Sequence, residues 1–222
     1  MRPPFIVLSL VALLTTQGTS AQSLSITYRS DFFLSNLLGS VLKTDTFSTA
    51  GTQTSIYRLN ISNNKSEYLF VESRRDTAKA GFSFKVLNQR VIYKDFGDMV
   101  MYMQSVSSPN IVSREPMQFD FWNLRHEEVR EILGYRCKKA TETAPAGDDG
   151  LTAWYAPDIP VSDGPQNFYG LPGLILVVEH RVYSITALDV VSHTDTKPIN
   201  LPQADAYVTP AEFARLTRPK KN

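Results

Sequence analysis

The sequence predicts a mainly β protein: an antiparallel sheet, a sandwich or an open half-barrel, with a few short helices. Three observations support this class. About ten short segments alternate apolar and polar residues or are rich in β-branched and aromatic side chains. Turn-forming Gly, Pro, Asn and Asp residues separate these segments at the spacing of hairpins. Helical periodicity is confined to a few short stretches.

The segments expected to form strands follow one another with short connections. The clearest hairpin turns at Asn63-Asn64-Lys65, because Asn tolerates the left-handed backbone that a tight turn needs. A second hairpin is expected around residues 96–98. The expected strands are 24–29, 55–61, 67–71, 90–95, 99–104, 111–115, 117–122, 135–141, 151–155, 174–179 and 182–190.

Helix is expected in only a few places. Residues 31–41 fit either a short helix or a hydrophobic loop, and residues 122–133 fit one or two helical turns or an ordered loop. Near the C-terminus, Thr209 has the character of an N-cap, with Pro at the first helical position and Glu at the third. Phe213 and Leu216 would then form one apolar face.

The most apolar short run of the chain after residue 21 is 174–178, which is aliphatic throughout and is typical of a strand buried on both faces. Leu171-Pro172-Gly173 directly before it suits a type II turn, because Pro fixes φ at the second position and Gly supplies positive φ at the third. A long irregular segment rich in proline precedes the turn.

Residues 1–21 have the features of an export signal. Arg2 gives a positive start, residues 5–14 are mostly apolar, and Thr19-Ser20-Ala21 supplies small residues before the expected cleavage point. The apolar run is shorter than the ~20 residues of a transmembrane helix, and no later stretch approaches that length. We therefore expect one mainly β domain over residues 22–222, periplasmic or secreted, with no transmembrane segment after cleavage.

The charge balance and the cysteine count limit the kinds of partner and covalent bond that we expect for this chain. Residues 1–21 hold one Arg and no acid, so the 23 basic and 22 acidic residues of the full chain become equal in number after cleavage. A neutral chain argues against a general nucleic-acid partner. The only cysteine, Cys137, cannot form an internal disulfide. It is interpreted as a small buried residue, with a reactive thiol or an intermolecular bridge as alternatives.

One block of the chain resembles a known family. It contains Trp122-Asn123-Leu124, residues 132–141, Thr152-Ala153-Trp154-Tyr155, Ile159-Pro160, Gly164-Pro165, Phe168 and Gly170-Leu171-Pro172-Gly173-Leu174-Ile175. This ordered set resembles the GLPGLI (Porph_ging) family of exported Bacteroidetes proteins. The family has no established activity, so the resemblance implies compartment and architecture. Within this block, Gly170 to Ile175 and Cys137 are expected to have structural roles.

No residue set for a defined catalytic or metal chemistry stands out. The three histidines, His126, His180 and His193, lack the close spacing of a zinc site, and no Gly-x-Ser-x-Gly or Gly-rich phosphate loop occurs. We therefore predict no catalytic residue, metal or cofactor. An envelope hydrolase using Cys137 or the loop carboxylates Asp158 and Asp163 is the alternative.

Aromatic and acidic residues flank the proline-rich segment. Their ordinary role would be to cover the sheet, and their functional role would be to line a groove for a peptide, glycan or lipid. The predicted function is a non-catalytic binding or assembly factor of the cell envelope, with an envelope protein or small hydrophobic ligand as partner. The oligomeric state is left open. The candidate binding residues are Trp154, Tyr155, Asp158, Asp163, Phe168 and Tyr169.

Overall fold

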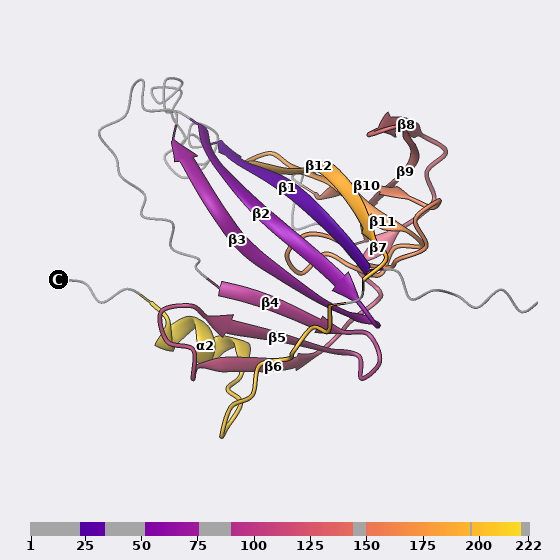
Figure 1. The fold of residues 1–222 in the computed structure, drawn as a ribbon. Helices are drawn as coiled ribbons and strands as arrows, with labels where there is room; N and C mark the ends of the chain where they lie inside the picture. Colours follow the sequence, from indigo (N-terminus) through magenta and orange to yellow (C-terminus); the bar gives the residue numbers. More distant parts are fainter. Residues whose placement is uncertain (1–22, 34–51, 76–89, 144–149, 196, 219–222) are drawn as a thin grey trace, which may run out of the picture.

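One 12-stranded antiparallel sheet makes up most of the structure (Figure 1). The structure is a computed structural model that describes residues 23–33, 52–75, 90–143, 150–195 and 197–218. The predicted mainly β, antiparallel class is confirmed, and its form is an open sheet. Where a few short helices were expected, the described residues contain one. The expected export signal and residues 34–41 lie outside the described residues.

The strands are close to the expected ones and are mostly longer. The helix is α2, Pro210–Leu216. The strands are β1 (Ser23–Phe33), β2 (Thr52–Ser62), β3 (Lys65–Arg75), β4 (Arg90–Asp95), β5 (Val100–Ser105), β6 (Val112–Pro116), β7 (Trp122–Asn123), β8 (Val129–Ile132), β9 (Tyr135–Glu142), β10 (Thr152–Ala156), β11 (Leu174–His180) and β12 (Tyr183–His193).

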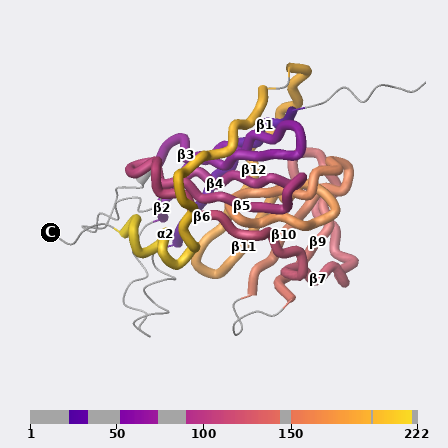
Figure 2. The backbone as a smooth tube through the Cα atoms, turned by 90° about the horizontal axis from the view of Figure 1, so that it is seen from below, coloured from indigo at the N-terminus to yellow at the C-terminus, as the bar shows by residue number. Residues whose placement is uncertain are grey.

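Strand β1 joins the two halves of the sheet. The order is β6-β5-β4-β3-β2-β1-β12-β11-β10-β9-β7, with β8 paired to β9. The register shifts at Thr27/Tyr28, Ile56/Tyr57 and Trp154/Tyr155 mark irregularities that bend and twist strands. In Figure 1, β1–β3 cross the view diagonally, β4–β6 lie below them and β9–β11 lie to the right. Figure 2 shows the same halves from below.

The proline-rich segment, residues 157–172, packs against buried strands and pairs with the start of β11. Leu174 N–H donates to the Ile159 carbonyl at 3.1 Å, and Ile175 N–H donates to the Asp163 carbonyl at 2.9 Å. Across the core, the Tyr28 hydroxyl donates to the Ile175 carbonyl at 2.6 Å. Residues 174–178 are all buried, as their uniform apolar character predicts. The core therefore lies between the sheet and this segment.

The structure confirms most of the predicted turns and caps. Asn63 and Asn64 adopt φ of 50° and 60° in the β2–β3 turn. Thr209 accepts from Glu212 N–H, and the Glu212 side chain accepts from Thr209 N–H, which completes a capping box with Pro210 in the first turn. Phe213 is buried as expected, whereas Leu216 is exposed.

Three local predictions differ from the structure. Residues 117–121, expected within a strand, are irregular. Residues 122–133, expected to form helical turns or an ordered loop, contain the short strands β7 and β8, which both pair with β9, and the irregular residues 124–128 between them. Leu171-Pro172-Gly173 is not a type II turn, since Gly173 N–H donates to the Leu171 carbonyl at 2.8 Å and Leu174 N–H bonds elsewhere. The requirement for Gly holds nonetheless, with φ of 151° at Gly173.

The outer strands of the sheet are short or covered. Strand β7 has two residues, and β6 forms a parallel bridge from Ser113 to Val208, the segment that leads into α2. Short and covered edges protect a sheet from pairing with other chains. Within the described residues, no helix is long and apolar enough to cross a membrane.

Gly173 is expected to be the most sensitive position of the turn. A Cβ there would lie 2.3 Å from the Ala156 carbonyl oxygen, and the φ of 151° already disfavours any other residue. Gly173→Ala should lower the free energy of unfolding by about 3 kcal/mol or more. Urea unfolding monitored by tryptophan fluorescence measures this.

Gly134→Ala is the matched control. Gly134 also has positive φ, 80°, but no heavy atom lies within 4 Å of a Cβ there. Only the backbone penalty of about 1–2 kcal/mol should remain. Equal losses in the two variants would contradict the role of the close contact at Gly173.

Candidate functional site

Asp163, expected as a binding residue, belongs to a buried ion pair. The side chains of Asp163 and Lys94 are both 0% exposed, and Lys94 Nζ contacts Asp163 Oδ1. Lys94 also donates to the Gly164 carbonyl at 2.7 Å, and Gly164 N–H donates to Asp163 Oδ1 at 2.7 Å. Asp163 Oδ2 is buried without a hydrogen-bond partner in the described part of the chain. The pair thus clamps the proline-rich segment to β4.

Burial governs the ionisation of this region. Desolvation lowers the pKa of Lys94, and the charge and hydrogen bond of Asp163 oppose that shift. Desolvation also raises the pKa of Tyr28 well above its usual value, and the negative charge of Asp163 adds to the effect. Because neither member of the pair reaches solvent, the geometry gives Asp163 a structural role.

The other predicted site residues do not converge on one place. Tyr155 is 5% exposed and belongs to the core, whereas Asp158 is exposed at the start of the proline-rich segment. Trp154 lies at another surface, where its Nε1 donates to Glu179 Oε2 at 3.2 Å. The Arg130 guanidinium lies 5.7 Å from the Trp154 ring and 3.0 Å from Glu179 Oε1. These contacts hold Trp154 against its neighbours.

Phe168 and Tyr169 line a groove of about 270 Å³. Tyr169 fixes its shape, because its carbonyl accepts from Trp122 Nε1 at 2.8 Å and its hydroxyl accepts from Gln118 N–H at 2.9 Å. The Phe121 and Trp122 rings meet edge to face at 4.7 Å. We name this feature the aromatic groove, and its lining residues are Met101, Glu115, Pro116, Gln118, Asp120, Phe121, Trp122, Asn167, Phe168 and Tyr169.

The aromatic groove carries acids and amides but no base. Glu115 is half-buried, and its carboxylate has no ion pair or hydrogen bond within the described residues. Burial raises the pKa of Glu115. The Gln118, Asp120 and Asn167 side chains are exposed at the rim. A half-buried carboxyl beside aromatic rings in a hollow is the combination that marks a candidate binding site.

Sequence reasoning found two of the groove residues and missed the others. The segment 117–122 was interpreted as a strand, and its alternation of polar and aromatic residues gave no sign of a groove. The available signal was Pro116, which interrupts the strand pattern next to Glu115. The groove forms only because the proline-rich segment lies against residues 115–122. Contacts between such distant parts of the chain leave no local sequence pattern.

Cys137 is buried in the core on β9. Its thiol contacts the Tyr135 carbonyl at 3.6 Å, and burial raises the thiol pKa to about 11. A thiol that stays protonated is a poor nucleophile. Lys138, its neighbour, is exposed, as the alternation of a strand predicts. These surroundings are those of a packing residue.

The motif from Gly170 to Ile175 forms the framework next to the groove. Leu171, Leu174 and Ile175 are fully buried, whereas Pro172 is exposed. Gly170 has φ of 91° and approaches the Phe119 ring. In the described part of the chain, no group of three or more His, Cys, Asp or Glu residues could hold a metal ion.

Comparison with known proteins supports the fold and the sequence resemblance. Residues 146–177 match the family described as "Protein of unknown function (Porph_ging)". No curated protein matches the chain. Two solved structures of PNGF-II, in space groups C2 and P21, are similar in fold with TM-scores of 0.54 and 0.55 at 17% identity. The similarity covers 89% of this chain and 33% of PNGF-II, so the chain spans about a third of that protein.

Breaking the buried pair should be costly. Lys94→Met leaves the Asp163 carboxylate desolvated and unpaired, and should lower the free energy of unfolding by about 3–5 kcal/mol. The double variant Lys94→Met/Asp163→Asn also removes the unpaired carboxylate, and it should recover part of the lost free energy of unfolding. Chemical denaturation at neutral pH measures both.

The exposed pair of Arg130 and Glu179 provides the comparison. Its side chains are about half exposed and 3.0 Å apart, so Arg130→Met should cost no more than about 1 kcal/mol. A loss below about 1 kcal/mol for Lys94→Met as well would mean that the buried pair does not clamp the segment.

Glu115 should make stability depend on pH. Because its folded pKa is raised, the folded state holds the proton more tightly, so stability falls as pH rises through the interval between the unfolded and folded pKa. Glu115→Gln should therefore raise the thermal midpoint at neutral pH and leave it unchanged below about pH 4. The difference between variant and parent midpoints across that range is the measurement, and an equal difference at all pH values would refute it.

Proposed function

We propose that residues 22–222 are exported and act in the periplasm or outside the cell as a non-catalytic binding protein. The aromatic groove is its binding site, and a saccharide is the ligand class that the groove suits best. The observation behind this proposal is the set of aromatic rings beside an unpaired, half-buried Glu115 in a hollow of about 270 Å³. The similarity to the Porph_ging family and to the PNGF-II fold is compatible with many activities.

The mixed lining favours a saccharide over a purely apolar ligand. Sugar rings offer C–H faces that pack on Phe121 and Trp122, and hydroxyls that donate to carboxylates and bond to amides. An apolar ligand would desolvate Glu115 without replacing the hydrogen bonds it loses. Glu115 and Asp120 also make the groove acidic, so neutral sugars should bind better than acidic ones.

The envelope hydrolase alternative lacks support from the residues expected to serve it. Cys137 is buried with a raised pKa, and Asp163 is held by Lys94. Asp158 remains exposed without its expected partner acid. A protein partner remains compatible with the exposed rim of the groove.

The test is binding of neutral and acidic oligosaccharides by isothermal titration calorimetry. A neutral oligosaccharide should bind and raise the thermal midpoint. Asn167→Ala and Glu115→Gln should each weaken binding by roughly tenfold, the loss expected for one hydrogen bond to a charged or well-placed group.

Gln203→Ala is the matched control, because Gln203 is exposed and does not line the groove. Binding that is indifferent to Asn167 and Glu115 would exclude the groove as the site. Release of reducing ends during the titration would contradict a non-catalytic role and favour a glycoside hydrolase.

A further inference from the structure

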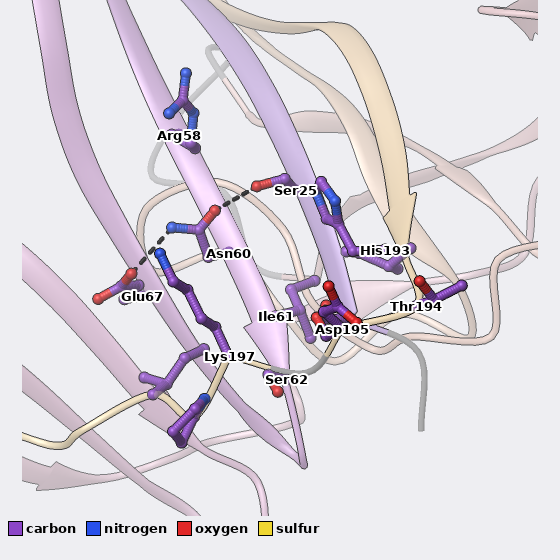
Figure 3. A pocket seen from close by; sticks show the side chains of 14 residues that line it. Ser25, Arg58, Asn60, Ile61, Ser62, Glu67, His193, Thr194, Asp195 and Lys197 are labelled. Atoms are coloured by element: carbon purple, nitrogen blue, oxygen red, sulfur yellow. Dashed lines mark hydrogen bonds between the residues drawn. The ribbon is translucent and has the colours of Figure 1, made fainter. Parts of the chain in front are cut away.

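A second cavity, of about 500 Å³, lies where four strands of the sheet begin or end (Figure 3). Strand β1 begins there, β2 ends, β3 begins nearby and β12 ends at His193. One wall of the cavity is lined by residues that follow β12, namely Thr194, Asp195, Lys197, Pro198 and Ile199. Its volume is within the range of small-molecule sites. It shares no lining residue with the aromatic groove, and its lining contains His193 but no Phe, Tyr or Trp.

Charges of both signs line this terminal cavity. Arg58 and Lys197 provide two cations, and Glu67 and Asp195 provide two carboxylates. No ion pair in the described part of the chain joins any of the four side chains. Because these oppositely charged groups do not pair with one another, each can form an ion pair with a ligand. A simple anion would also meet the two carboxylates, and a simple cation the two bases, so the balanced set favours a ligand with both charges.

One wall of the cavity is held in place by hydrogen bonds across three strands. Ser25 donates to Asn60 Oδ1, and Asn60 Nδ2 donates to Glu67 Oε1 at 2.9 Å. Figure 3 shows this chain running from β1 through β2 to β3, with Lys197 extending toward it from the opposite wall. Because Asn60 is fixed at both ends, Glu67 has a set orientation, which lowers the entropy lost when a ligand binds.

Ser62 supplies a separate indication of a ligand. Its side chain lines the cavity and is 2% exposed, yet its hydroxyl has no hydrogen-bond partner in the described residues. Buried hydroxyls nearly always have partners, because an unsatisfied one costs free energy. A polar ligand in the cavity is one way to satisfy it.

We propose that the terminal cavity binds a zwitterionic ligand, a free amino acid or short peptide with both termini uncapped. Arg58 and Lys197 hold the ligand carboxylate, and Glu67 and Asp195 hold the ammonium group. Leu24, Ile61 and Ile199 also line the cavity and offer apolar surface to the side chains or backbone of the ligand. This site is independent of the aromatic groove and of the function proposed for it.

The test is calorimetric titration of the full chain with trialanine. Uncapped trialanine should bind, and acetylation of its N-terminus or amidation of its C-terminus should each weaken binding by roughly tenfold or more. In Lys197→Gln, amidation should weaken binding by a smaller factor than in the parent, because only Arg58 remains to hold the carboxylate. In Glu67→Gln, acetylation should likewise weaken binding by a smaller factor, because only Asp195 remains to hold the ammonium group. Such reduced discrimination assigns each charge to its partner.

Two controls separate binding from folding. Lys138→Gln removes an exposed lysine on β9 outside the cavity and should leave every affinity unchanged. Ser62→Ala removes an unsatisfied hydroxyl, so it should keep or raise the thermal midpoint while weakening binding of trialanine. The proposal is overturned if trialanine does not bind at millimolar concentration, or if the capped peptides bind as tightly as the free one.

Discussion

The buried ion pair between Lys94 and Asp163 is the interaction on which the rest of the structure depends. It joins Lys94, near the end of β4, to a segment far along the chain, and both side chains are fully buried. Burying two charges carries a large desolvation cost that their attraction only partly repays, so such a pair is a weak source of net stability. Its effect is specificity: any other position of the segment would leave one charge buried alone.

The position of the proline-rich segment follows from this constraint. With Asp163 fixed, its carbonyl accepts from Ile175 N–H, and Gly164 lies so close to Ile175 that a Cβ on Gly164 would be 2.7 Å from the Ile175 Cβ. Five residues on, Phe168 and Tyr169 reach the edge of the sheet, where Trp122 donates to the Tyr169 carbonyl. The ion pair between Lys94 and Asp163 therefore determines where the aromatic groove forms, even though Lys94 does not line the groove.

Local signals predicted most of the strands but not the contacts that build the sites. The Asn63-Asn64 turn, the Thr209 capping box and the aliphatic run 174–178 each satisfy a requirement within a few residues, and each was predicted. Lys94 could not be distinguished from an exposed strand residue, because its partner is distant in sequence. The short strands β7 and β8 were missed for the same reason, since pairing with β9 defines them.

The division between framework and groove explains why recognising the motif does not specify a ligand. The residues that match the Porph_ging family, 146–177, contain the acid of the ion pair, Gly170 and Gly173 with positive φ, and the buried start of β11. They contribute Asn167, Phe168 and Tyr169 to the aromatic groove. The side of the groove that carries Glu115, Asp120 and Trp122 is formed by residues 115–122, which lie outside the residues that match the family. Substitutions in residues 115–122 can change the chemistry of the groove without disturbing the clamp, so one framework can carry different ligand preferences.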